Sequence, residues 1–148
     1  LSIALGLEGL AAGAALTGCC CQMIGFAVMS YKENKVGGLI SQGLGTSMLQ
    51  IPNIIKNPLI WIPPTLASAL LGPISTTVFK MKADSVGAGM GTSGLVGQFS
   101  TYTVMGNEAF IGIALLHFLL PAVLSYVIAM YMRKKRYIKE NDLLLQNK

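Results

Sequence analysis

The pattern G-x-G-T-S-x-L occurs twice in this chain, at residues 43–49 and at residues 89–95. Each copy lies inside a long apolar stretch. Glycine pairs followed by two hydroxyl residues interrupt a helix and leave main-chain N–H and C=O groups without intrahelical partners. An apolar solvent cannot satisfy such groups, so a neighbouring element, a cavity or a ligand must do so. The repeat therefore predicts two interrupted helices that adjoin a binding site.

Composition places these stretches in a membrane. Only 11% of the 148 residues are charged, whereas a soluble domain has about 25%. Hydrophobic residues make up 53%, and the mean hydropathy is +0.61. So few charges could not cover the core of a soluble domain. The net charge of +5 is concentrated in the basic run 133–136 beside an apolar segment, which indicates cytoplasmic anchoring and no nucleic-acid partner.

Three segments are long enough to span a bilayer. Residues 110–131 contain no formal charge and would extend about 33 Å as a helix, against a hydrocarbon core of about 30 Å. Residues 3–29 and 59–79 have similar length. Residues 39–50 are too few to cross and predict a half-helix or a re-entrant hairpin arm. A charged turn is expected at 31–38, with the helix broken by Gly37 and Gly38.

The expected fold is therefore all-α, a multi-pass helical membrane protein with interrupted or re-entrant helices. We expect a transmembrane domain over residues 1–137 and a cytoplasmic tail over 138–148. Leu1 is not an initiator methionine, so the chain is interpreted as part of a longer protein. Gly9 and Gly13 have the G-x-x-x-G spacing that permits close packing of the first segment against protein.

The candidate binding residues cluster at the two interruptions. Thr46, Ser47, Thr92 and Ser93 supply hydroxyls that can donate and accept hydrogen bonds. The amides that follow the interruptions can pair with vicinal hydroxyls of a sugar; they belong to Gln50, Asn53 and Gln98. The alternative is that both motifs are helix-packing surfaces, because small and hydroxyl residues are common where membrane helices touch.

Three ionisable residues in or beside the apolar stretches are further candidates. His117, the only histidine, could bind a sugar hydroxyl or relay a proton, or could simply be hydrogen-bonded within the bundle. Glu8 could contact substrate or lie near the membrane surface. Glu108 could bind sugar or cap the last span, where a carboxylate is favoured by the helix dipole.

Neither the histidine nor the three consecutive cysteines predict catalysis or metal binding. Cys19, Cys20 and Cys21 lie within an apolar helix and lack the C-x-x-C spacing of zinc and thioredoxin-type sites. They are interpreted as structural. No catalytic residue, metal or cofactor is expected in this chain.

Several motifs in sequence order resemble one family of transporters. They comprise 43–47, the run I-P-N-I-I-K-N-P at 51–58, the run I-P-P-T-L-A-S at 62–68, G-P-I-S-T at 72–76, and 89–97. Together they resemble the membrane IIC component of bacterial phosphotransferase-system sugar transporters. More narrowly, they are similar to the toxin-regulator branch, named for a protein linked to perfringolysin expression, and to the C-terminal half of its members.

The resemblance implies a permease component in the bacterial cell membrane. Such a component would translocate sugar by alternating access, and cytoplasmic phosphotransferase components would trap the sugar by phosphorylation. A homo-oligomer in the lipid bilayer is expected. The chain itself carries no soluble relay domain, so its classification as an enzyme stays open. The alternative function is a membrane sensor or regulator that retains the transporter fold without transport.

Overall fold

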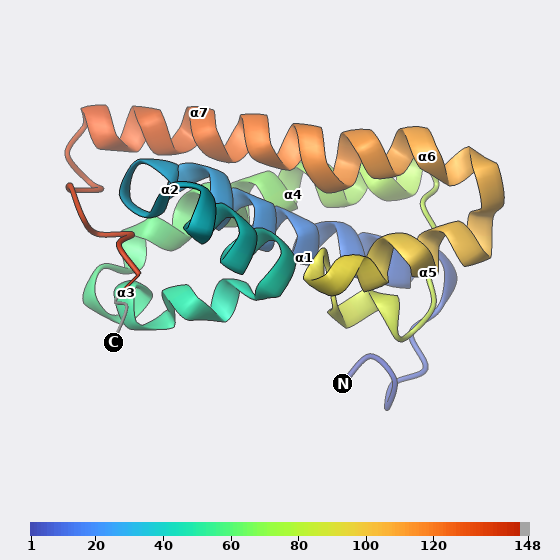
Figure 1. The fold of residues 1–148 in the computed structure, drawn as a ribbon. Helices are drawn as coiled ribbons and strands as arrows, with labels where there is room; N and C mark the ends of the chain where they lie inside the picture. The colour runs from blue at the N-terminus through green and yellow to red at the C-terminus, as the bar shows by residue number, and fades with distance from the viewer. Residues whose placement is uncertain (146–148) are drawn as a thin grey trace.

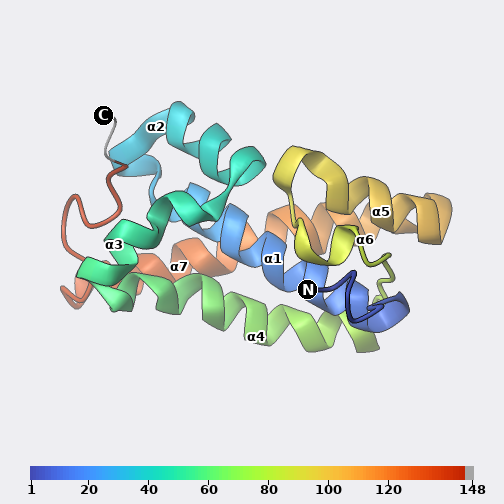
Figure 2. The same cartoon turned by 90° about the horizontal axis from the view of Figure 1, so that it is seen from below.

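The computed structural model describes residues 1–145, and α1 (Gly9–Met29) forms the centre of the molecule. Two long elements, which run antiparallel to each other, pack along α1 (Figures 1 and 2). One is α4 (Ile62–Thr77), which is continuous with a 3-10 turn at Pro58–Trp61. The other combines α6 (Ala109–Gly112), a π-helical stretch at Ile113–Leu119 and α7 (Leu120–Lys134). Within residues 1–145 the only strand-like pairing is an isolated bridge between Gly9 and Ala83.

Three stretches are long and apolar enough to cross a membrane, at Gly9–Met29, Pro58–Thr77 and Ser93–Lys134. The third folds back on itself at Gly106, whose φ of +72° reverses the chain between α5 (Val96–Met105) and α6. The predicted all-α fold with several apolar helices of membrane-spanning length is confirmed for the described residues. The first two stretches lie close to the predicted 3–29 and 59–79, whereas the third begins earlier than the predicted 110–131, because α5 and the turn at Gly106 continue its apolar length.

Close packing in the bundle depends on glycines, which have no side chain. A Cβ on Gly25 of α1 would lie 2.6 Å from Ser125 Oγ on α7 and 2.9 Å from Pro64 Cβ on α4. Gly25 thus lets the three long helices approach one another. Gly13 has a different role, because its missing Cβ makes room for the main chain at Met81, in the loop after α4. The G-x-x-x-G face therefore packs on an extended segment and not on a helix.

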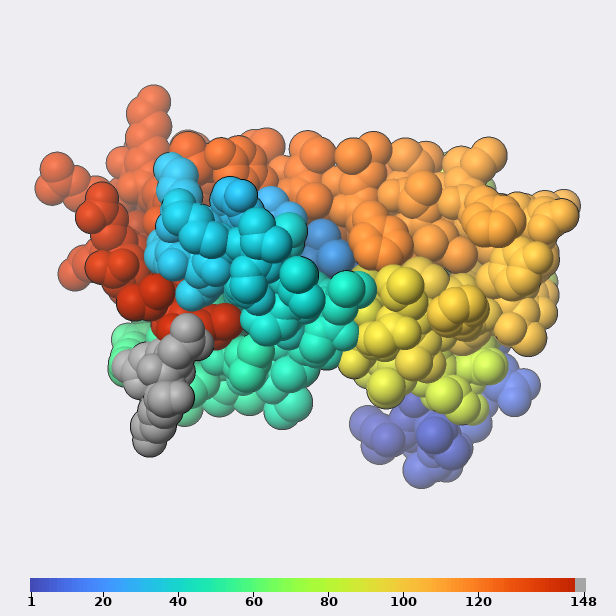
Figure 3. All heavy atoms as spheres, in the orientation of Figure 1, coloured from blue at the N-terminus to red at the C-terminus, as the bar shows by residue number. Residues whose placement is uncertain are grey.

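Two short hairpins lie against α1 from its opposite ends. Hairpin 1 comprises residues 31–56, and hairpin 2 comprises residues 83–105. Figure 3 shows the two in contact on one face of the molecule, hairpin 1 in cyan to green and hairpin 2 in yellow. Hairpin 1 consists of α2 (Tyr31–Ile40), a π-helical turn at Ser41–Gly45, a 3-10 turn at Ser47–Gln50 and α3 (Ile51–Lys56). Hairpin 2 consists of 3-10 turns at Gly87–Gly89 and Ser93–Leu95, followed by α5.

The prediction of a charged turn at 31–38 is wrong in detail. These residues belong to α2, and the interruption falls at Lys35 (φ +53°, ψ −150°) and not at the glycine pair. Gly38 stays helical because its missing Cβ leaves room for the side chain of Asn34, which a methyl group would overlap. Gly38 thus serves packing, and neither glycine ends the helix.

The two ends of the bundle differ in charge. One end carries Lys32, Lys35, Lys56 and the basic run 133–136. The opposite end carries Glu8, Lys80, Lys82, Asp84 and Glu108, because the loop after α4 pairs with the start of α1 through the Gly9–Ala83 bridge. By the positive-inside rule, the basic end is expected to face the cytoplasm. The structure thereby separates Lys56 from Lys80 and Lys82, which the sequence alone could not place.

Residues 138–145 fold back onto the basic end. Ile138 and Leu143 are buried in a cluster with Phe26, Met29 and Ile60. The proposed boundary between residues 137 and 138 stays a prediction, but these tail residues contribute directly to the packing of the bundle. We refer to residues 138–145 as the C-terminal segment.

The contact of Gly13 predicts unequal effects of two alanine substitutions in α1. Gly13→Ala should destabilise the protein by about 1–3 kcal/mol, because the new methyl overlaps the Met81 carbonyl group. Gly18→Ala is the matched control. Among residues 1–145, no atom lies within 4 Å of a Cβ at Gly18, so the higher helix propensity of alanine should leave stability unchanged or raise it by up to about 1 kcal/mol. Unfolding midpoints in detergent would measure both, and equal destabilisation would contradict the assignment.

Candidate functional site

The tips of the two hairpins meet beside α1. Thr92 in hairpin 2 donates a short hydrogen bond from Oγ1 to the main-chain oxygen of Gly43 in hairpin 1, and Ser93 Oγ donates to the oxygen of Gly45 at 2.9 Å. Thr92 is fully buried, and its hydroxyl also lies 3.7 Å from the sulfur of Met23 in α1. We call this contact the tip junction. It joins the two copies of the repeated pattern.

Both copies interrupt the helix, but by different geometry. In the first, Thr46 is extended (φ −156°, ψ 139°), and its hydroxyl accepts from the N–H of Met48 at 3.2 Å, starting the 3-10 turn. In the second, Gly91, Gly94 and Leu95 all have positive φ. Gly91 also lies against Cys19 and Met23, where a Cβ would be 3.0 Å from each side chain. The repeat in sequence is therefore not a repeat in conformation.

The predicted hydroxyl residues divide accordingly. Thr92 and Ser93 bond across the tip junction, whereas the exposed Thr46 bonds within its own hairpin. Ser47 is half-buried beside it. All four side chains lie in or next to the tips, so the structure brings them into one region.

Gln98 and His117 form a buried polar pair near hairpin 2. Gln98 Nε2 lies 3.2 Å from His117 Nδ1 and 3.5 Å from the sulfur of Cys20. If the amide donates to Nδ1, the neutral imidazole carries its proton on Nε2. Within the described residues, His117 Nε2 and Gln98 Oε1 are buried without hydrogen-bond partners. The pair thus offers one free donor and one free acceptor.

A pocket with aromatic walls adjoins this pair. It has a volume of about 260 Å³ and is lined by Leu95, Gln98, Phe99, Tyr102, Phe110 and Ile113. Tyr102 and Phe110 pack with their ring centroids 5.3 Å apart. Gln98 and Tyr102 border the pocket, but the surface that faces it is almost wholly apolar.

Gln50 and Asn53 lie on the other side of hairpin 1, away from this pocket. Gln50 Nε2 donates to Gln42 Oε1 at 2.8 Å and to the main-chain oxygen of Leu143 at 3.0 Å. Asn53 Nδ2 donates to Gln50 Oε1 at 2.8 Å and to the oxygen of Leu144 at 3.0 Å. The C-terminal segment therefore occupies the amides that were predicted to bind sugar.

Gln42 is the residue of this network that the sequence analysis missed. It is fully buried and donates to Ser30 Oγ at 2.8 Å and to the oxygen of Gly38 at 3.2 Å. A signal was present in the sequence, because a carboxamide directly before a glycine-rich interruption in an apolar stretch must find partners.

The two candidate glutamates lie away from the tip junction. Glu8 directly precedes α1, and Glu108 is exposed directly before α6, both at the less basic end of the bundle. Neither side chain makes a capping hydrogen bond. The structure does not bring them together with Gln98, His117 or the hairpin tips.

Asp84 anchors the start of hairpin 2. Its Oδ1 accepts from the N–H of Gly87 and from Ser100 Oγ, both at 2.8 Å. These two hydrogen bonds stabilise the carboxylate and hold the pKa of Asp84 below its ordinary value of 3.8. The first part of hairpin 2 is thereby hydrogen-bonded to α5.

A protein-family model described as "Phosphotransferase system, EIIC" matches residues 1–145. The chain belongs to the phosphotransferase-system EIIC family. The family resemblance inferred from the sequence motifs is thus confirmed. Membership implies a membrane component of a sugar-transport phosphotransferase system, which works with a sugar and with the other components of that system. No curated protein and no solved structure matches the chain.

The tip junction of this EIIC chain predicts a specific loss on removal of one hydroxyl. Thr92→Val keeps the side-chain shape but leaves the buried oxygen of Gly43 unpaired, which should cost about 1–3 kcal/mol of stability. Thr103→Val is the matched control, because the Thr103 hydroxyl bonds only to Phe99 of its own helix and is exposed. Unfolding in detergent measures the difference, and equal effects of the two substitutions would argue against a stabilising junction.

The contacts of Asp84 predict that the stability of the protein depends on pH only in the acidic range. A carboxyl with a lowered pKa contributes stability above its ordinary pKa of 3.8 and loses it as the pH falls through the lowered value. The wild type should therefore lose more stability than Asp84→Asn when the pH is lowered through this range. Melting curves of both proteins from neutral to acid pH would measure this, and a constant difference at every pH would contradict it.

Proposed function

We propose that this chain forms part of the sugar route of an EIIC permease, with the substrate bound beside the tip junction. The observation that carries the proposal is the pair of unpartnered atoms on Gln98 and His117. One free acceptor and one free donor complement a hydroxyl group, which both donates and accepts. The family match to a sugar-transport system supports the same substrate class.

The aromatic walls of the adjoining pocket suit a sugar as well. Sugar rings have apolar C–H faces, and Phe99, Tyr102 and Phe110 present flat apolar surfaces beside the Gln98 amide. Thr92 and Ser93 lie at the tip of the same hairpin, six and five residues before Gln98. Gln98 and His117 are thus the central ligands of the proposed site, with the hairpin tips at its edge.

Alternating access would involve movement of the hairpins against the long helices. Each hairpin enters and leaves at the same end of the bundle, and the two meet halfway along α1 (Figure 2). In a bilayer this arrangement corresponds to two re-entrant segments that close the route from opposite sides. Separation of the tips on one side at a time would open the route. Cytoplasmic phosphotransferase components would then phosphorylate the arriving sugar.

The proposal keeps the finer assignments made from sequence. They are a position in the toxin-regulator branch, a place in the C-terminal half of a longer protein, the bacterial cell membrane and a homo-oligomer. The regulatory alternative is favoured by one observation, the C-terminal segment folded onto the cytoplasmic end. In that case the fold would sense a sugar and signal through the basic end without transport.

Uptake of a panel of radiolabelled hexoses by cells that express the full-length protein tests the proposal. Gln98→Ala and His117→Ala should each lower uptake by about tenfold or more, because each removes a hydrogen-bonding group that the substrate uses. Gln22→Ala is the matched control. Gln22 lies on α1 and bonds to Trp61 and Thr65 on the far side of the bundle, so uptake should persist.

Two results would count against the permease. Unchanged uptake in both the Gln98 and His117 variants would remove the site from the route. Absence of uptake of every hexose, together with a sugar-dependent change in expression of a target gene, would favour the regulator.

A further inference from the structure

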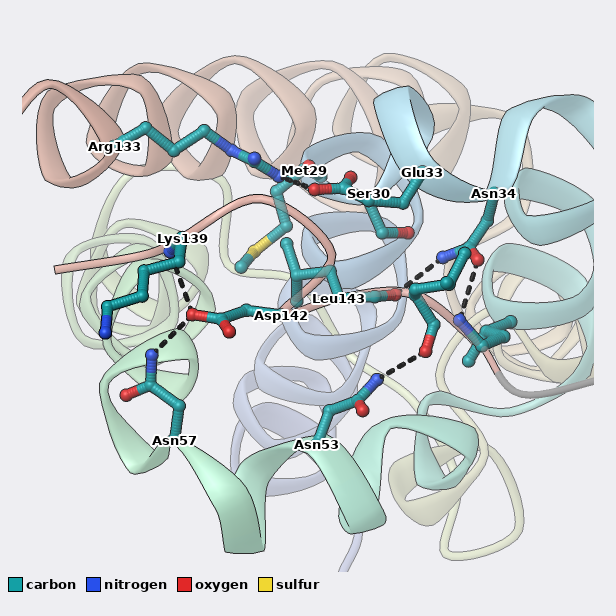
Figure 4. Close-up of polar contacts among 12 residues, drawn as sticks. Met29, Ser30, Glu33, Asn34, Asn53, Asn57, Arg133, Lys139, Asp142 and Leu143 are labelled. Atoms are coloured by element: carbon teal, nitrogen blue, oxygen red, sulfur yellow. Dashed lines mark hydrogen bonds and ion pairs between the residues drawn. The ribbon is translucent and has the colours of Figure 1, made fainter. Parts of the chain in front are cut away.

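The C-terminal segment lies in a groove on the basic end of the bundle, between hairpin 1 and the ends of α1 and α7 (Figure 4). The contacts of the groove are directed mainly at its main chain. Gln50 and Asn53 donate to the oxygens of Leu143 and Leu144, and Asn57 donates at 3.1 Å to the oxygen of Tyr137, directly before the segment. Recognition of main-chain atoms suits a peptide of varied sequence.

Asn34 contributes the most specific of these contacts. Its Nδ2 donates to the oxygen of Leu143 at 2.7 Å, and its Oδ1 accepts from the N–H of Leu145 at 2.8 Å. The two bonded groups flank Leu144, and a residue on a parallel neighbouring strand would make the same pair of hydrogen bonds. A single side chain therefore takes the place of a partner strand, as in the binding of extended peptides at sheet edges.

One side chain of the segment fills an apolar pocket. Leu143 is fully buried against the cluster that contains Phe26 and Ile60. Asp142 Oδ2 accepts from Asn57 Nδ2 at 2.7 Å and, within the segment, from the N–H of Lys139 at 2.8 Å. The segment contains turns, in which the N–H groups of Asp142 and Leu144 donate to the oxygens of Lys139 and Asn141. The ligand that fits this groove is thus a short peptide that forms a turn and carries a leucine anchor preceded by an acidic residue.

The segment can leave the groove without unwinding a helix. It follows the end of α7, where Arg136 has a φ of +62°, and it contains no helix or strand over residues 138–145. An open pocket of about 440 Å³ lies along its outer side, lined by Lys32, Glu33, Arg133, Ile138, Glu140 and Asn141. α7 itself stays attached to α2 through Arg133 and Glu33, at 2.6 Å.

The groove is connected to the tip junction. The Gln50 side chain donates hydrogen bonds both to the C-terminal segment, at Leu143, and to Gln42. Gln42 directly precedes Gly43, whose main-chain oxygen accepts from Thr92. Occupancy of the groove therefore favours one arrangement of hairpin 1. Departure of the segment would leave Gln50 and Asn53 without these partners and loosen the hairpin.

We infer that this groove is an exchangeable peptide-binding site, occupied in cis by the C-terminal segment, and that its occupancy holds hairpin 1 in place. The inference goes beyond the proposed function, since it concerns the hairpin and not the sugar. It holds equally for a permease and for a regulator. Its test therefore needs no transport measurement.

Hydrogen–deuterium exchange of the full-length protein in detergent provides the test. Leu143→Asp should displace the segment and accelerate exchange of amides in residues 41–56 by roughly tenfold or more, with the core of α1 and α4 still protected. Addition of a synthetic peptide with the sequence of residues 136–145 should restore protection. The same peptide carrying Leu143→Asp should not.

A second variant covers the case in which Leu143→Asp disturbs the whole fold. Asn34→Ala removes the two-sided main-chain contact without placing a charge in the core, and it should give the same local acceleration. Excess peptide should restore less protection here than in the Leu143→Asp variant, because the defect lies in the groove and not in the segment. Asn107→Ala, at the opposite end of the bundle, is the control and should change nothing in residues 41–56. Unchanged exchange of hairpin 1 in the Asn34 variant, or failure of the peptide to restore protection in a Leu143→Asp variant whose α1 and α4 stay protected, would overturn the inference.

Discussion

The interrupted main chain of hairpin 1 needs hydrogen-bond partners, and hairpin 2 supplies them. Where Thr46 turns out of the helix, the oxygens of Gly43 and Gly45 are freed from intrahelical pairing, and the hydroxyls of Thr92 and Ser93 donate to them. In a hydrocarbon environment an unpaired carbonyl is costly. Hairpin 2 therefore stabilises the interruption of hairpin 1, and this contact helps to fix where the two hairpins lie on α1.

The long helices could be predicted because uninterrupted apolar length is nearly sufficient to define them. Both interruptions were also evident from glycine and hydroxyl residues in apolar surroundings. The conformation of each copy was not, because Thr46 caps its own turn while Thr92 reaches another hairpin. Identical residue types leave that choice to tertiary contacts. The same limit explains why Gly38 remained helical, since its role depends on the neighbouring side chain of Asn34.

The candidate site was predictable in part. Gln98 and His117 were chosen as separate polar residues in apolar segments, and the structure makes them a pair. Gln50 and Asn53 follow the first interruption in sequence, yet they contact the C-terminal segment, 93 and 91 residues further along the chain respectively. Nothing in the local sequence signals a contact over that separation. Glu8 and Glu108 were conspicuous as charges beside membrane segments, but the fold leaves them at the surface of one end.

The π-helical stretch that holds His117 has a consequence for the whole last span. A π-helix accommodates more residues per turn than an α-helix, so Ile113–Leu119 stores surplus chain between α6 and α7. Conversion of this stretch to α-geometry would twist everything beyond it by about 100° for each residue released. The His117 imidazole would move away from Gln98, and Arg133 would move relative to Glu33. Such a rotation would couple the surroundings of His117 in the middle of the span to the position of Arg133 at the basic end of the bundle.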